Sequence, residues 1–199
     1  MHTGPDAETH HHHHHTGTKW LDVVLALSAM IVSVVSLFVA IHHGDTMEKM
    51  VQADTWPYVD FARSTATADN KPAAVLMLSN NGVGPARIET FEVRYKGQPI
   101  TDKGAFIKAA SGDETLAEYA VTSTATDRVI SAGTKIDFLT ILPPDTSTPA
   151  FTQYRRSLYD VSATVCYCSA LDQCWVRDSE KPKAEKVDQC PVSQHPYER

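Results

Sequence analysis

Between residues 44 and 194 the sequence has no histidine. Serine and cysteine hydrolases use an imidazole as general base, and catalytic zinc sites nearly always use one as a ligand. After the first eighteen residues only His42, His43 and His195 remain, beside an apolar run and near the C-terminus. The gap excludes histidine-dependent catalysis from the middle of the chain. We expect no catalytic residues, no metal site and no cofactor.

Dense clusters of lysine and arginine are also missing, and the formal net charge is −6. A surface that binds nucleic acid needs positive charge along one face to neutralise phosphates. The only Gly-x-Gly, Gly82 to Gly84, is too short for a dinucleotide loop. We therefore expect neither a nucleic-acid partner nor a nucleotide.

The N-terminal region combines a histidine tag with a long apolar run. The stretch "THHHHHHTG" identifies residues 1–18 as an expression tag. From Leu21 to Ile41 the only charged residue is Asp22, and the run is long enough to cross a hydrocarbon core of about 30 Å. We predict a transmembrane helix over 19–43 that contacts membrane lipid. A cleaved signal peptide is the alternative, but its apolar region would be shorter.

Small residues recur along this run with spacings that alternate between four and three. Such a heptad pattern keeps one helix face against a neighbour, and small side chains let membrane helices approach closely. We predict parallel homo-oligomers through this seam, extended by helix over 44–55 to just before Trp56-Pro57. The alternative is that alanine and serine are simply common in membrane helices. The seam comprises Asp22, Ala26, Ala29, Ser33, Ser36, Ala40, His43, Met47 and Met50.

Short β-branched and aromatic runs separated by turn residues follow from Tyr58 onward, and they are typical of antiparallel strands. The fold class is mainly β: an antiparallel sandwich, or a barrel, over 56–178 with short helical insertions, followed by an irregular tail over 179–199. The insertions are "DKGAFIKAAS" and "PAFTQYRRSLY". The strand segments are "YVDFAR", "AAVLMLSN", "ARIETFEVRYKG", "EYAVTSTA", "TKIDFLTIL", "DVSATVCYC" and "QCWVRD".

One segment between two of these strands, "SNNGVGPARI", is rich in turn residues. Asn81 and Gly82 are suited to a left-handed turn, Gly84 adds conformational freedom, and Pro85 restarts an extended chain. We predict a strand-turn-strand corner in which Gly82 has a positive φ.

All four cysteines lie in the last third of the chain. Cys166 and Cys168 are two residues apart and so share one face of a strand. If a hairpin turns at about residues 170–173, Cys168 faces Cys174 and Cys166 is left for Cys190. This pairing is preferred, although four cysteines permit three connectivities. A four-thiolate zinc site is the alternative, but such sites usually contain C-x₂-C.

The cysteines also bear on location, because an even, clustered set suits an oxidising compartment. We expect a single-pass protein with its N-terminus inside and its domain outside, which in a bacterium means the periplasm. The basic-residue rule adds little here, since Lys19 is the only basic residue just before the span.

With its apolar anchor, "SNNGVGPARI" and "YCSALDQCW", the chain resembles small uncharacterised bacterial membrane-anchored proteins with an immunoglobulin-like β-sandwich domain. The resemblance implies a fold and no activity.

Three functions remain open on the sequence. The first is a non-catalytic interaction module that oligomerises through its helix and presents the β domain to a protein partner. The second is a sensor or effector whose outer domain binds a small ligand and changes helix packing. The third is a carboxylate hydrolase, which needs two acids across a cleft. Its candidate acids are Asp60, Asp113, Glu114, Asp127, Asp137 and Asp160.

Overall fold

The structure is a computed structural model that describes residues 19–67, 69–143 and 145–197. The tag predicted over residues 1–18 lies outside the described residues. The chain divides into two compact units at Lys49, and each is described by itself.

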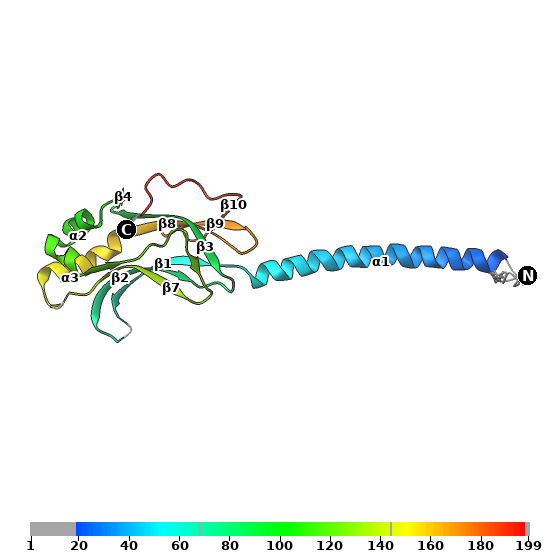
Figure 1. Cartoon of the computed structure of the whole chain (residues 1–199), viewed down its shortest axis with the longest axis horizontal. Coiled ribbons are helices and arrows are strands. Elements are labelled where there is room, and N and C mark those ends of the chain that lie inside the picture. Colours follow the sequence, from blue (N-terminus) through cyan, green and yellow to red (C-terminus); the bar gives the residue numbers. More distant parts are fainter. Residues whose placement is uncertain (1–18, 68, 144, 198–199) are drawn as a thin grey trace, which may run out of the picture. The chain divides into compact units, whose positions relative to one another are not determined.

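The first element is one unbroken helix, α1 (Lys19–Asp54), which is long and apolar enough to span a membrane by length and composition (Figure 1). It continues through Gly44 and ends two residues before Trp56, since the residue that precedes a proline disfavours α geometry. None of its described residues is buried. Bulky apolar side chains such as Leu37 and Phe38 are exposed on it.

The rest of the chain forms two antiparallel sheets, and neither closes into a barrel. The first sheet has the order β1-β2-β7-β5: β1 (Val59–Ala66), β2 (Pro72–Asn80), β7 (Lys135–Ile141) and β5 (Ala120–Thr122). The second has the order β10-β9-β8-β3-β4: β10 (Glu185–Val187), β9 (Cys174–Asp178), β8 (Val161–Cys168), β3 (Ala86–Tyr95) and β4 (Gln98–Pro99). A short strand, β6 (Val129–Ile130), also pairs with β3.

Both predicted insertions are helical: α2 (Lys103–Ser111) and α3 (Pro149–Ser157). The Asp102 carboxylate caps the N-terminus of α2 and the Thr148 hydroxyl caps that of α3. Short 3₁₀ helices, η1 (Glu114–Tyr119) and η2 (Leu158–Asp160), lie beside them in the chain. The helices gather at the end of the sheets opposite the β2–β3 corner (Figure 1).

Both sheets contribute to one hydrophobic core. Phe91 of β3 packs against Phe138 of β7 in an edge-to-face contact with ring centroids 4.9 Å apart. Phe151 and Tyr154 of α3 extend this core under the helices. A side-chain ion pair of Arg177 with Asp60 at 3.2 Å joins β9 of one sheet to β1 of the other.

All seven predicted strand segments contain a strand, although some boundaries are shifted: β1, for example, continues to Ala66, beyond "YVDFAR". In "EYAVTSTA" the first two residues end the 3₁₀ helix η1, and β5 begins only at Ala120. Three short strands, β4, β6 and β10, were not predicted from the sequence. They are two or three residues long, too short to show an alternating pattern.

Candidate functional site

The nine seam residues all lie on α1, and every one is exposed. A spacing of four and three residues brings them onto one stripe of a helix with 3.6 residues per turn. The Ser33 hydroxyl donates to the Ala29 carbonyl oxygen at 2.8 Å, so its proton is used inside the helix. Its oxygen can still accept a hydrogen bond from a neighbouring helix.

The β2–β3 corner is built around Asn80, which is fully buried at the end of β2. Its side-chain oxygen accepts from the backbone N–H groups of Tyr58, at 3.1 Å, and Gly82, at 3.0 Å. Its amide nitrogen donates to the carbonyl oxygens of Gly84, at 2.8 Å, and Ile130, at 3.0 Å. The Asn80 side chain thereby connects the corner to Tyr58, just before β1, and to Ile130 of β6. Both of its polar atoms are hydrogen-bonded, as is usual for a buried amide.

The corner connects the two sheets as expected, but the predicted left-handed turn is wrong. Positive φ values occur at Gly97, Gly112 and Gly133, and not at Asn81, Gly82 or Gly84.

The glycines of the corner are instead explained by the close approach of another backbone segment. A Cβ atom on Gly82 would lie 2.4 Å from the Tyr58 nitrogen, and one on Gly84 would lie 2.0 Å from the Thr55 oxygen. The Trp56 carbonyl oxygen accepts from the N–H groups of Val83, at 3.0 Å, and Gly84, at 3.2 Å. The segment from Thr55 to Tyr58, which leads into β1, therefore packs directly against the corner. The space between them is too small for a side chain at Gly82 or Gly84.

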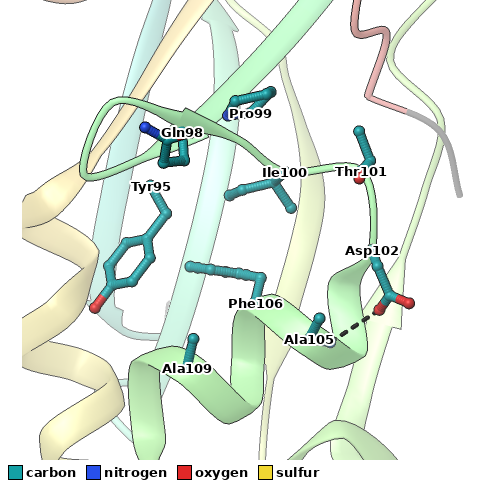
Figure 2. Close-up of a pocket in the computed structure, with 9 residues that line it drawn as sticks. All are labelled: Tyr95, Gln98, Pro99, Ile100, Thr101, Asp102, Ala105, Phe106 and Ala109. Atoms are coloured by element: carbon teal, nitrogen blue, oxygen red, sulfur yellow. Dashed lines mark hydrogen bonds between the residues drawn. The ribbon is translucent and has the colours of Figure 1, made fainter.

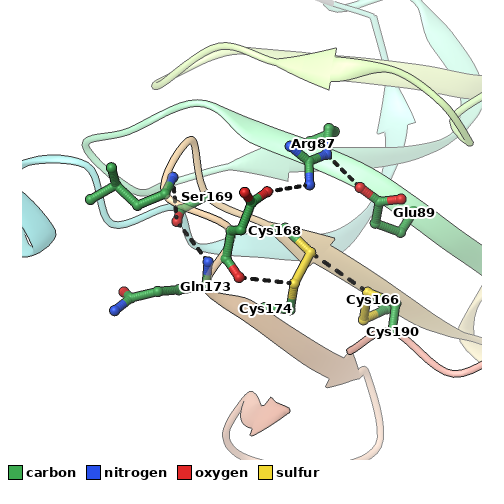
Figure 3. Close-up of a disulfide and its surroundings, with 10 residues drawn as sticks. Arg87, Glu89, Cys166, Cys168, Ser169, Gln173, Cys174 and Cys190 are labelled. Carbon is green, nitrogen blue, oxygen red and sulfur yellow. Dashed lines mark hydrogen bonds and ion pairs between the residues drawn. A yellow bond between two sulfur atoms is a disulfide. The ribbon is translucent and has the colours of Figure 1, made fainter. Parts of the chain in front are cut away.

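The four cysteines form two adjacent disulfides, shown in Figure 3. Cys168 and Cys174 are directly opposite in the β8–β9 hairpin, with Cα atoms 4.0 Å apart. Cys166 is joined to Cys190, whose Cα atom lies 5.7 Å away. This is the pairing expected from the shared strand face. Three sulfurs, of Cys168, Cys174 and Cys190, lie within 4.8 Å of one another, but a disulfide sulfur is not the thiolate that zinc requires.

The C-terminal tail is more firmly attached than its composition indicates. Besides Cys190, the Glu92 carboxylate accepts from the Ser193 hydroxyl at 2.7 Å and from the Gln194 N–H at 3.1 Å. Tyr197 is only 4% exposed and packs against Phe91, and its N–H donates to the Phe91 carbonyl oxygen at 2.8 Å. The tail thus closes one stretch of the β3 edge and fills part of the core.

Ionisation of Glu92 is coupled to this attachment. Burial by itself raises the pKa of Glu92, but the hydrogen bonds from Ser193, His195 and Gln194, together with the Arg94 charge, outweigh it, so that the pKa is lowered. The tail therefore binds the carboxylate form. Burial raises the pKa of the Tyr197 phenol.

The pockets of the β domain are open to solvent and modest in size. One of about 210 Å³ lies between the β3–β4 hairpin and α2, where Tyr95, Ile100 and Phe106 line it (Figure 2). Its one carboxylate, Asp102, is held by the Ala105 N–H at 2.8 Å. A wider depression of about 450 Å³ lies on the outer face of the first sheet over Val75. Neither is an enclosed cavity in which a few polar groups converge, as is typical of a small-molecule site.

The candidate acids of a hydrolase are scattered rather than paired across a cleft. Asp113 caps η1. Four of the remaining five acids each form an ion pair with a lysine or an arginine. Asp127 occupies a turn with φ 58°. The cation pairs are Asp60 with Arg177, Glu114 with Lys108, Asp137 with Lys135 and Asp160 with Lys96.

The sequence matches no protein-family model and no curated protein. The functional interpretation therefore depends on the geometry of the chain itself.

Three features of this geometry were not predicted from the sequence. They are the hydrogen bonds that attach the tail to Glu92, the burial of Tyr197, and the grouping of Arg155 and Arg156 of α3 with Arg63 of β1 around Tyr159. Glu92 alternates with apolar neighbours in β3 like any outward strand residue. The doublet Arg155-Arg156 beside aromatic residues was the one available sequence signal.

Proposed function

We propose that the protein is a membrane-anchored, non-catalytic interaction module that oligomerises through α1 and presents its β domain to a protein partner. The observation that carries the proposal is the long, exposed apolar surface of α1, none of whose described residues is buried. Such a surface is stable only in lipid or against other helices.

The seam favours self-association over a plain anchor. Ala29, Ser33 and Ser36 leave one stripe free of bulk, which allows the backbones of two helices to approach closely. Outside the apolar run, the exposed Met47 and Met50 continue the stripe. Their burial in water would add to the association. Identical copies with their domains on the same side would associate in parallel.

For the β domain we propose an immunoglobulin-like sandwich. The sheet orders support this, because β1, β2, β7 and β5 occupy the places of strands A, B, E and D, while β3, β8 and β9 occupy those of C, F and G. The chain departs from antibody domains in its disulfides. Antibody domains join strands B and F, whereas here both bridges involve the F-like strand β8 and residues after it.

We place the domain on the outer side of the membrane, the periplasm in a bacterium, with the N-terminus inside. Two disulfides support this placement, because reducing compartments keep thiols free. The interaction module is preferred to a sensor that encloses its ligand inside the β domain, because side chains of both sheets occupy the core and the pockets in Figure 2 and over Val75 lie at the surface. It is preferred to the hydrolase because the candidate acids are separately engaged.

Crosslinking of single cysteines in membranes tests the proposal. The variants are made in a background that lacks the native cysteines, so that only the introduced thiol can form an intermolecular bond. We expect efficient dimer formation from the seam positions and little from the opposite face. The seam set is Ser33→Cys, Ser36→Cys and Ala40→Cys, and the control set is Ile31→Cys, Val34→Cys and Phe38→Cys.

A second pair of variants separates packing from accessibility. Ser33→Leu with Ala40→Leu should abolish the oligomer, whereas Leu27→Ala with Leu37→Ala should leave it intact. Equal crosslinking of both cysteine sets, or none in either, would contradict assembly through the seam and reduce α1 to a plain anchor.

A further inference from the structure

Three arginines gather around one exposed aromatic ring at the α3 end of the β domain. The ring is that of Tyr159 in η2, which is 71% exposed. Arg155 and Arg156 come from α3, and Arg63 comes from β1. Two pockets of about 270 and 280 Å³ adjoin Tyr159, with Arg63 lining the first and the other two arginines lining the second.

The second pocket is lined entirely by side chains that can donate hydrogen bonds. Its five lining residues supply two guanidinium groups and three hydroxyl groups, and no carboxylate. They are Thr65, Thr152, Arg155, Arg156 and Tyr159. Such a lining offers donors to the oxygens of an anion.

Among the described residues, Arg155 and Arg156 lack the carboxylate partners that three other arginines have. Arg87, Arg94 and Arg177 each form a salt bridge with a carboxylate. Within the part of the chain that the structure describes, no ion pair within 4.0 Å holds Arg155 or Arg156. Their charge is therefore available to a ligand.

Contacts with neighbouring groups orient two of the three guanidinium groups, those of Arg155 and Arg63. The Arg155 guanidinium lies 5.9 Å from the centroid of the fully buried Phe151 ring. Arg63 donates to the Leu158 carbonyl oxygen at 3.0 Å and lies 5.7 Å from the Tyr159 ring centroid. A guanidinium fixed in this way loses less conformational freedom when it binds an anion.

We propose that the pocket lined by Arg155 and Arg156 binds a phosphate group. A guanidinium fork matches the oxygens of phosphate, and the hydroxyls of Thr65, Thr152 and Tyr159 supply more donors than a carboxylate can use. The pocket is large enough for a phosphate with a small substituent, and it is smaller than most pockets that bind drug-sized ligands. The source is free phosphate or the headgroup of an anionic phospholipid. This site is independent of helix assembly.

Calorimetric titration of the full chain in neutral detergent tests the site, with inorganic phosphate as the probe at constant ionic strength. We expect saturable binding that Arg155→Gln with Arg156→Gln weakens at least tenfold, because the variant loses both guanidinium groups and their charge-assisted hydrogen bonds to the phosphate oxygens. Arg128→Gln is the matched control, an exposed arginine outside both pockets. Its affinity should equal that of the unaltered chain.

Two further titrations identify the source of the phosphate. Monomeric short-chain phosphatidylglycerol that binds more tightly than inorganic phosphate, and is weakened by the same double variant, would indicate a lipid headgroup. Tighter binding of inorganic phosphate would indicate the free ion. The proposal is overturned if neither probe saturates, if the double variant binds like the Arg128→Gln control, or if acetate binds as tightly as phosphate. The titrations do not depend on helix assembly, so the absence of crosslinking at the α1 seam would not change their interpretation.

Discussion

Gly84 lies so close to Thr55 that a Cβ atom on the glycine would be 2.0 Å from the Thr55 carbonyl oxygen. Thr55 directly follows α1, and Gly84 belongs to the corner between the two sheets. The Gly84 N–H also donates to the Trp56 carbonyl oxygen at 3.2 Å. The corner thus holds the segment through which the chain leaves the helix, and its glycines leave room for that segment.

Substitution of either corner glycine should destabilise the β domain. We expect Gly84→Ala and Gly82→Val to lower the free energy of unfolding by about 1–3 kcal/mol or more, because backbone atoms below 3 Å from the new Cβ must move. Thermal unfolding followed by near-ultraviolet circular dichroism measures the effect. Gly44→Ala is the control, since nothing lies within 4 Å of its Cβ position. An unchanged unfolding temperature in Gly84→Ala would contradict the close approach.

The two disulfides should be present in the protein and should contribute unequally to stability. Intact mass under non-reducing conditions should be four hydrogens below the fully reduced mass. Loop-closure entropy assigns about 3.5 kcal/mol to Cys166–Cys190 and about 2.4 kcal/mol to Cys168–Cys174, because the first closes the longer loop. Denaturant unfolding of the two paired alanine variants, Cys166→Ala with Cys190→Ala and Cys168→Ala with Cys174→Ala, compares them. Four free thiols, or one equivalent of bound zinc, would refute the assignment.

Tyr197 should stabilise the domain through its ring and not through its hydroxyl. The ring packs against both Phe91 and Phe138, whose centroids are 5.7 and 5.3 Å away. Because Tyr197→Ala removes this buried ring, it should lower the free energy of unfolding by about 3–5 kcal/mol. The hydroxyl has no hydrogen-bond partner among the described residues, and Tyr197→Phe should therefore change stability by less than about 0.5 kcal/mol. The denaturant midpoints of the two variants and of the unaltered chain measure these differences. A neutral Tyr197→Ala would show that the tail does not complete the core.

Acid should loosen the tail through Glu92. Its pKa is lowered from the ordinary value of 4.5, so the folded chain favours the carboxylate more than the unfolded chain does. The resulting stability is complete above about pH 4.5 and is lost as the pH falls through the lowered pKa. Between pH 7 and pH 3 the unaltered chain should therefore lose more unfolding free energy than Glu92→Gln, in which this group cannot titrate. Parallel pH profiles of the two proteins would contradict the coupling.

Local patterns in the sequence were sufficient for the elements with a clear period. The helix over 19–54 follows from an apolar run without interruption and from the proline at position 57, and β8 follows from alternating residues. The same alternation places Cys166 and Cys168 on one face, which leads to the pairing that the structure has. For the helix, for β8 and for Cys168–Cys174, the deciding interactions are between neighbours in the chain or across one tight hairpin. Cys166–Cys190 was assigned because these two cysteines remained.

The remaining features depend on segments that are distant in sequence, and only the tertiary structure decided them. Gly82 was read as a left-handed turn because turn propensity is local, whereas its actual constraint is the backbone at Tyr58. Tyr197 stands in a polar tail with no apolar period, and its burial results from the space beside Phe91. The chain has no basic cluster along its sequence, yet packing of α3 near β1 gathers arginines around Tyr159. Sequence periodicity records which face of an element is buried, but it carries no information on which distant element covers it.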